Sequence, residues 1–353
     1  MGAFRYTFEY MQESSYIQRK TNKRALVNKA RKKARHFQKR EAIPLSHTES
    51  EEIQEGERLG IVAGRNGHTF SVLEHDILYE CQVSPKSPAN LLHHLVVGDA
   101  VIFEEDERGI LHILRRRKRR SWIVRMRGDR ARGVNALEEH TIAANVDSAV
   151  IVAAADSPPF HPRFIDRYLA VLQNGNVEPV ICLNKIDLTT ERHPILSFYR
   201  KLNIPIIETS VVTGEGLPQL GEMLDGKTAV FLGQSGVGKS SISNAILPDA
   251  SIAVADVSKK GSKGRHTTTT SNLYRWQKDS YIIDTPGIRS LGIENIDKDR
   301  IRFFFSEFAG FEDQCNYTDC LHDHEPDCAV KTSAESGEIN MYRYESYLRM
   351  LHE

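Results

Sequence analysis

One short run, Gly233-Gln-Ser-Gly-Val-Gly-Lys-Ser240, constrains the fold of this chain more than any other feature. It completes a phosphate-binding loop pattern and lies between an apolar run, Ala229 to Leu232, and a helix-like run from Ser241. Such a loop holds phosphate with backbone N–H groups and a lysine amine, and its serine hydroxyl ligates Mg²⁺. We therefore expect an α/β domain whose phosphate site comprises Gly233, Gln234, Ser235, Gly236, Val237, Gly238, Lys239, Ser240 and Ser241.

The sheet of this domain is indicated by continuous apolar runs that alternate with helix-like segments from Ile142 onward. Runs of this kind are typical of parallel strands that helices cover on both faces. They are Ala149 to Ala153, Pro179 to Leu183, Ile204 to Ile207, Ala229 to Leu232 and Tyr281 to Ile283.

A second motif indicates which base the site selects. Asn184-Lys185-Ile186-Asp187 follows a buried run, where its loop is expected beside the purine. A carboxylate at Asp187 can accept hydrogen bonds from guanine N1–H and the 2-amino group, whereas adenine offers neither donor and leaves the charge unpaired. Thr209 and Ser210, in Glu208-Thr-Ser, resemble the loop that backs the guanine O6 in GTPases. The expected ligands are GTP and GDP.

The segments that sense the γ-phosphate follow the phosphate-binding loop. In Asp284-Thr-Pro-Gly287, Asp284 is expected to hold Mg²⁺ through water, and the Gly287 N–H to contact the γ-phosphate. The first switch should lie in Gly264 to Thr270, and Thr268 is our choice among its threonines as a second Mg²⁺ ligand. Ile288 stands where many GTPases carry a glutamine that orients the attacking water, so another residue must do so.

The order of these motifs is unusual. The guanine motifs precede the phosphate-binding loop and the switches, whereas ordinary GTPases have the reverse order. A sheet tolerates this circular permutation because packing, and not the position of the chain ends, fixes the fold. The second switch then runs directly into the C-terminal region, so loss of the γ-phosphate can move that region.

The remaining sequence predicts additional domains. Short β-like runs between Leu59 and Leu114 indicate a small barrel, of either the oligonucleotide-binding (OB) or the SH3-like type. Basic blocks at residues 19–40 and 115–132 are typical of polyanion binding or disorder. We predict a basic, partly disordered extension at 1–50, a barrel at 51–118, the permuted GTPase domain at 119–292, and a metal-binding module at 293–353.

Three clustered cysteines predict the metal site. Cys315, Cys320, His322 and Cys328 offer three thiolates and one imidazole, enough for a closed tetrahedral Zn²⁺ site with a structural role. His324 is an alternative to His322. In a reducing compartment, clustered cysteines favour a metal over disulfides.

The chain carries no sign of a membrane segment or signal peptide. No apolar run approaches the roughly 20 residues that a membrane span needs, and the start lacks a basic-then-apolar pattern. We expect a cytoplasmic monomer. An amphipathic helix is predicted from Ile339 to Leu351, with its aromatic residues used for packing.

Together these motifs resemble the RsgA (YjeQ) family, the ribosome small-subunit-dependent GTPases of bacteria. The likeness covers about residues 56–353 and includes Ile142-Ala-Ala-Asn-Val-Asp, Gly264-Arg-His-Thr-Thr-Thr and the spacing of the cysteines. The resemblance implies an OB barrel, a permuted GTPase domain and a zinc module that act in late maturation of the small ribosomal subunit and bind its rRNA. It also points to His266 as the residue that positions water.

Two other functions fit parts of the pattern. An RNA-binding assembly chaperone could use GTP as a structural ligand only. A GTPase of large-subunit assembly shares the permuted motif order, although the barrel and the cysteine cluster argue against it.

Overall fold

The computed structural model describes residues 52–88, 91–127, 138–247, 271–284 and 298–353. The chain divides into two compact units, one of which contains Glu52–Ala309 and Ala334–Glu353, and the other Gly310–Ser333. None of the described helices is both long and apolar enough to span a bilayer. The predicted boundaries at residues 51 and 293 fall outside the described residues and stay predictions.

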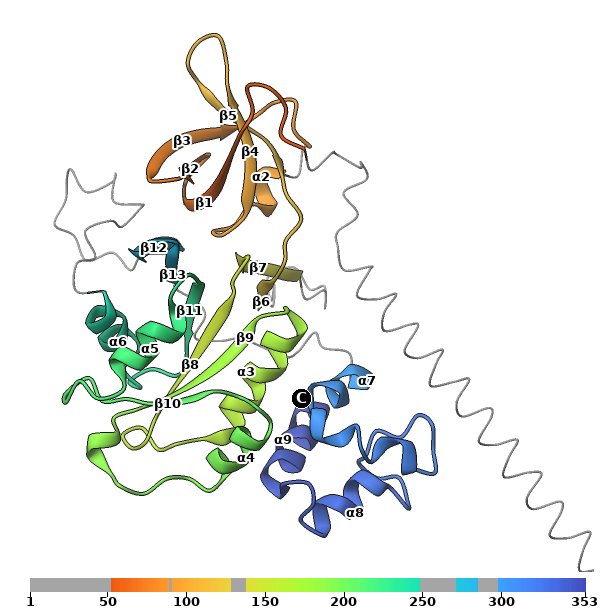
Figure 1. The fold of residues 1–353 in the computed structure, drawn as a ribbon. Helices are drawn as coiled ribbons and strands as arrows, with labels where there is room; N and C mark the ends of the chain where they lie inside the picture. Colours follow the sequence, from red (N-terminus) through yellow and green to blue (C-terminus); the bar gives the residue numbers. More distant parts are fainter. Residues whose placement is uncertain (1–51, 89–90, 128–137, 248–270, 285–297) are drawn as a thin grey trace, which may run out of the picture. The chain divides into compact units, whose positions relative to one another are not determined.

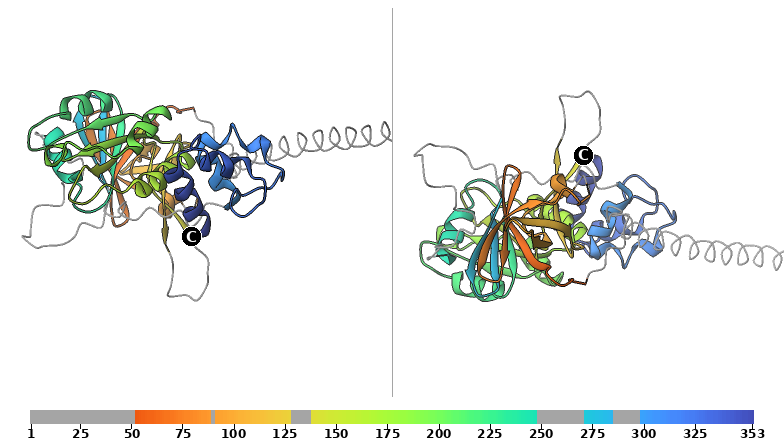
Figure 2. Two further views of the ribbon diagram at one scale, coloured as in Figure 1. Left: turned by 90° about the horizontal axis from the view of Figure 1, so that it is seen from below. Right: turned by 90° about the horizontal axis from the view of Figure 1, so that it is seen from above.

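The first domain is the predicted barrel. Strands β1 (Arg58–Asn66), β2 (Thr69–Glu74), β3 (Ile77–Val83), β4 (Ala100–Glu105) and β5 (Leu111–Arg116) close in the order β1-β2-β3-β5-β4 (Figure 1). The short helix α2 (Leu91–His94) joins β3 to β4, and β3 pairs with β5 in parallel. Alternating inward residues fill the core, among them Val62, Phe70, Val101 and Ile113. This strand order is that of an OB barrel, and the strands wind around one core (Figure 2).

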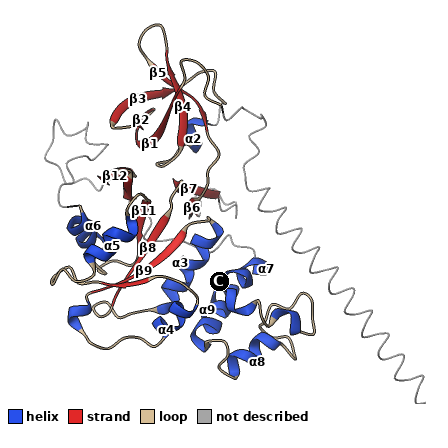
Figure 3. Ribbon diagram, in the orientation of Figure 1, coloured by secondary structure: helices blue, strands red, loops and turns tan. Residues whose placement is uncertain are grey.

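The central domain has a sheet of six strands in the order β10-β9-β8-β11-β13-β12. Strands β8 (Ser148–Ala154), β9 (Glu178–Asn184), β10 (Ile206–Glu208), β11 (Thr228–Leu232) and β13 (Ser280–Asp284) are parallel, as their apolar runs predicted. β12 (Asn272–Gln277) is antiparallel to β13. Helices α3 (Pro162–Asn174) and α4 (Ile195–Lys201) cover one side, and α5 (Leu217–Leu224) and α6 (Lys239–Ile246) the other (Figure 3).

A hairpin of β6 (Trp122–Arg127) and β7 (Glu138–Ala144) joins the barrel to the sheet, and the sequence pattern did not reveal it. The basic run beside it is largely neutralised. Arg115 pairs with Glu57, Arg119 donates to both oxygens of the buried Asp99 at 2.7 and 2.9 Å, and Arg120 pairs with Asp147 at 2.8 Å. Arg115 and Arg119 therefore stabilise the fold, whereas Lys118 and the ion-paired Arg120 are the exposed cations of residues 115–120.

The C-terminal segments carry short helices and one longer helix. Of these, the short helices α7 (Lys298–Ile301), η4 (Arg302–Phe304) and η5 (Ser306–Phe308) precede Gly310 in the chain. They are followed by η6 (Glu312–Gln314), α8 (Ala329–Glu335) and α9 (Met341–His352). The predicted amphipathic helix is confirmed as α9, and the Asn340 side chain caps it by accepting from the Tyr342 N–H at 3.0 Å. Tyr347 packs edge-on against Phe305 and Phe308, as expected for aromatic residues used in packing.

Candidate guanine-nucleotide site and metal centre

The nucleotide motifs meet at one edge of the sheet. Asn184 ends β9, Thr209 follows β10, Gly233 follows β11, and Asp284 ends β13. Because these strands are parallel, their carboxyl ends lie along the same edge, where open α/β sheets bind ligands. Strands β8 and β11 are neighbours although the chain forms β9 and β10 between them, so the phosphate-binding loop starts where the strand order reverses.

The phosphate-binding loop is compact because two glycines permit close backbone approach. Gly233 has φ 138°, and a Cβ there would lie 2.2 Å from the Val152 carbonyl oxygen. Gly238 has φ 100°, and a Cβ there would lie 2.3 Å from Asn184 Nδ2. Lys239 begins α6, and its amine donates to the carbonyls of Gly233 (2.7 Å) and Gln234. The loop thus combines a helix N-terminus with a cation held at its mouth, which suits a phosphate.

The Asn184 side chain links the guanine motif to the phosphate-binding loop. Its amide donates to the Val237 carbonyl at 2.9 Å, and its Oδ1 accepts from the Thr209 hydroxyl at 3.2 Å. Asn184 and Thr209 are both buried, with 2% and 0% exposure, so water does not compete for these bonds. The three segments predicted to bind the nucleotide are therefore held in one fixed arrangement.

The groups that would face the base are oriented as well. Ser210 Oγ donates to Asp187 Oδ1 at 2.5 Å, and Asp187 as a residue is exposed. Lys185 has φ 62° and its amine donates to the Ser157 carbonyl. The Ile186 N–H donates to the Thr209 carbonyl at 3.3 Å. A carboxylate fixed through one oxygen and open at the other can accept from a guanine edge.

The switch residues are only partly described. Asp284 is exposed at the end of β13, and Ser240 and Ser241 are exposed in the first turn of α6. Ser235 and Gly236 are also exposed at the tip of the loop. His266, Thr268 and Gly287 lie outside the described residues, so their roles stay predictions.

Sequence reasoning missed the loop between β8 and α3. Its Ser157 contacts Lys185, and its Pro158 Cδ lies 3.9 Å from the position that a Cβ on Gly236 would take. The segment Ala155-Asp-Ser-Pro-Pro-Phe160 matches none of the nucleotide motifs of the chain. Its proline pair after a buried strand was the available signal, because it indicates a fixed turn at the nucleotide edge.

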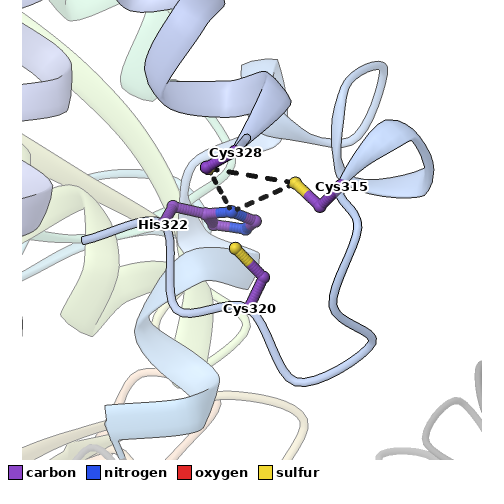
Figure 4. A group of neighbouring side chains, drawn as sticks. All are labelled: Cys315, Cys320, His322 and Cys328. Carbon is purple, nitrogen blue, oxygen red and sulfur yellow. Dashed lines mark hydrogen bonds between the residues drawn. The ribbon is translucent and has the colours of Figure 1, made fainter. Parts of the chain in front are cut away.

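The four expected metal ligands converge in the unit Gly310–Ser333 (Figure 4). Cys315 Sγ lies 3.9 Å from Cys328 Sγ, and His322 Nδ1 lies 3.6 and 3.4 Å from these two sulfurs. All four donor atoms, including that of Cys320, lie within 4.8 Å of one another. In tetrahedral zinc sites, donor atoms lie about 3.8 Å apart for two sulfurs and about 3.5 Å apart for sulfur and nitrogen. The donor set therefore fits such a metal. His324, the predicted alternative to His322, pairs with Asp323, and its side chain is 82% exposed.

The surroundings of the cluster act differently on its ligands. They favour the thiolate of Cys315, whereas burial raises the pKa of the Cys320 thiol. Burial opposes protonation of His322, but contacts with Cys315 and Glu312 outweigh it and raise the pKa of His322 to about 10. Burial opposes ionisation of Cys315, but His322 and the N–H groups of Val330 and Ala329 outweigh it and lower the pKa of Cys315 to about 7. The Glu312 carboxylate lies 3.7 Å from His322 Nε2, the nitrogen that faces away from the sulfurs. A carboxylate there orients the imidazole and raises its basicity, as in many zinc sites. Glu312 is a supporting residue that the ligand spacing could not reveal.

Comparison with known proteins agrees with this geometry. The family model described as RsgA GTPase matches residues 116–294. A small ribosomal subunit biogenesis GTPase RsgA of Pseudomonas putida is 37% identical over 301 residues, which cover 82% of this chain and 84% of that protein. The protein of the same name from Chlorobaculum parvum is 38% identical over 83% of this chain and 96% of that protein.

Solved structures give the same result. The crystal structure of YjeQ from Thermotoga maritima superposes with a TM-score of 0.64 at 32% identity, covering 84% of this chain and 98% of that one. The crystal structure of YloQ, a circularly permuted GTPase, has a TM-score of 0.65 at 26% identity, covering 87% of this chain and 96% of that one. With its permuted motif order, its barrel and its Cys₃His cluster, this chain belongs to the RsgA GTPase family.

Proposed function

We propose that this chain hydrolyses GTP as a late assembly factor of the small ribosomal subunit, acting as a cytoplasmic monomer. The observation that carries the proposal is the guanine site itself, in which buried Asn184 joins the guanine motif to the phosphate-binding loop. The names of the relatives, small ribosomal subunit biogenesis GTPase, support the partner. GTP would favour the form that docks on immature subunits and their rRNA, and hydrolysis would release it.

The metals have separate roles in this proposal. Ser240 and Thr268 would ligate Mg²⁺, with Asp284 holding it through water, and Mg²⁺ would supply positive charge to the β and γ phosphates. Gly287 would sense the γ-phosphate, and His266 would accept a hydrogen bond from the attacking water. Zn²⁺ would be held by Cys315, Cys320, His322 and Cys328 as a structural ion, because four protein ligands leave no open position.

Replacing Asp187 with asparagine should change the base that the site prefers. The amide can donate to the 2-oxo group of xanthine, whereas it no longer pairs with both donors of guanine. We expect GTP affinity to fall on the order of 100-fold and xanthosine triphosphate to become the better ligand. Competition against a fluorescent GDP measures both. Asp279→Asn is a matched control, because that exposed aspartate lies in the turn between β12 and β13, and retained GTP preference in Asp187→Asn would refute the base assignment.

The ribosomal role is tested by turnover with purified subunits. Small subunits should raise GTP hydrolysis on the order of 100-fold or more, because an activating partner completes the transition-state contacts that a free GTPase lacks. In His266→Ala the stimulated rate should fall while GTP affinity and co-sedimentation with small subunits persist. Equal losses in affinity and rate would make His266 a structural residue.

The same experiment separates the alternatives. Binding to small subunits without stimulated turnover would indicate an RNA-binding chaperone that uses GTP as a structural ligand. Stimulation by large subunits alone would assign the chain to assembly of the large subunit. The rRNA contacts should weaken with salt, since basic side chains release counterions when they bind phosphates.

A further inference from the structure

The C-terminal helix α9 is held against the GTPase domain by a buried ionic network. Arg343 donates to Asp166 on α3 at 2.5 Å and to Glu307 at 2.7 Å, and its side chain is 2% exposed. The Asp166 oxygen that it contacts also accepts from the hydroxyl of Tyr199 on α4 at 2.6 Å. One arginine of α9 therefore fixes the relative position of α3 and α4, the helices that follow β8 and β9.

The first turn of α9 makes a second contact, with loops near the nucleotide edge. The ring of Tyr342 lies edge-on to His193, with centroids 5.3 Å apart, and His193 lies 5.3 Å from the ring of Phe160. His193 belongs to the loop that follows the guanine motif, and Phe160 to the loop between β8 and α3. Tyr342 thus extends a row of three rings that joins these two loops.

Both loops also contact the nucleotide-binding residues. The loop of Phe160 contributes the Ser157 carbonyl that accepts from Lys185, and Pro158 lies beside Gly236 of the phosphate-binding loop. The loop of His193 begins at Thr189, directly after the 3-10 helix η1 (Ile186–Leu188) that carries Asp187. A shift of either loop would therefore change the position of groups that surround the base and the phosphates.

From these contacts we infer that Tyr342 and Arg343 are positioning residues for the guanine nucleotide, and that α9 retains GDP and GTP by holding both loops in place. The inference rests on guanine-nucleotide binding in the proposed function and is independent of the ribosomal partner. By reciprocity, a nucleotide that orders the loops also strengthens the docking of α9. A partner that displaces the first turn of α9 would then accelerate GDP release.

The rate of GDP dissociation from the full-length, metal-loaded protein tests this inference. The protein is loaded with N-methylanthraniloyl GDP and chased with unlabelled GDP in stopped flow. Tyr342→Ala should raise the dissociation rate about threefold to tenfold, the range expected for loss of one aromatic contact. Tyr342→Phe keeps the ring and should release GDP at the wild-type rate. Tyr342 is 50% exposed, so its replacement leaves the buried network intact.

Two further variants distinguish positioning from general destabilisation. Met341→Ala removes a side chain of similar exposure, 42%, from the same helical turn without removing a ring, and should leave the rate unchanged. His193→Ala should raise the rate as Tyr342→Ala does, and the double variant should show less than the product of the two effects because the residues share one contact.

The inference is overturned if Tyr342→Ala releases GDP at the wild-type rate, or if Met341→Ala accelerates release equally. It is also overturned if the increase in GDP release scales with the fall in melting temperature of the variants and is equally large in Tyr342→Phe. If the wild-type protein fails to bind GDP, the proposed function itself falls. If the wild-type protein binds GDP and the variants release it at the wild-type rate, the role of α9 is rejected and the proposed function is unaffected.

Discussion

Replacing Gly238 with alanine should lower guanine-nucleotide affinity on the order of 100-fold, because the new Cβ would lie 2.3 Å from Asn184 Nδ2. The φ of 100° is also a conformation that costs a residue with a side chain about 1–3 kcal/mol. Asn184 would have to move, and the bond from its amide to Val237 would be lost, which adds about 1 kcal/mol. Titration with a fluorescent GDP measures the loss, and circular dichroism checks that the chain still folds.

Gly236→Ala is the matched control for this effect. Gly236 has φ 83° in the same loop, but the nearest atom to a Cβ there is Pro158 Cδ at 3.9 Å, an ordinary contact. This variant carries backbone strain without the clash, so it should lose about tenfold in affinity. The difference between the two variants measures the close approach of Asn184. Equal affinities in both variants would contradict the fixed link between guanine motif and phosphate-binding loop.

Removing the metal should unfold the unit Gly310–Ser333 and leave nucleotide binding by the larger unit intact. The four ligands are at most 3% exposed and form much of the interior of a unit that is too short to build a stable core without a metal. Structural zinc sites contribute about 10–16 kcal/mol to such folds. Hydrogen exchange of residues 310–333, before and after chelation of the zinc-loaded protein, should show loss of protection.

Single substitutions locate the metal. Cys328→Ser should abolish bound zinc, measured by atomic emission, because it removes one of three thiolates. His324→Ala should keep one zinc per chain, since that imidazole is exposed and pairs with Asp323. Zinc loss in His324→Ala, or full retention in Cys328→Ser, would contradict the ligand assignment.

Local patterns predicted much of the fold. The strands of the central sheet and of the barrel follow from apolar runs and turn residues, because both report burial within a few residues of the chain. The phosphate-binding loop was also predictable from a local pattern, because its glycines and its lysine act within one turn of the chain. α9 was predicted from its periodicity, and its observed ends differ from the predicted ones by two residues or fewer.

What the sequence did not reveal depends on contacts between distant residues. Arg343 and Asp166 are 177 positions apart, and neither has a local pattern that indicates a partner. The basic run from Arg115 reads as a polyanion-binding segment, yet the structure gives Arg115, Arg119 and Arg120 partners at Glu57, Asp99 and Asp147. The β6–β7 hairpin was not predicted because basic residues interrupt the alternation of apolar and polar residues in β6.

The position of β11 in the sheet sets an order of events during synthesis. Of the strands in the six-stranded sheet, β8, β9 and β10 leave the ribosome first, and they are consecutive neighbours, so they can pair before the rest of the sheet exists. One edge of β8 then stays open until β11 emerges and pairs with it. The base-reading half of the site is therefore made before the phosphate-binding half, and a growing chain cannot hold a nucleotide until β11 closes that edge and brings Gly233 to Lys239 beside Asn184.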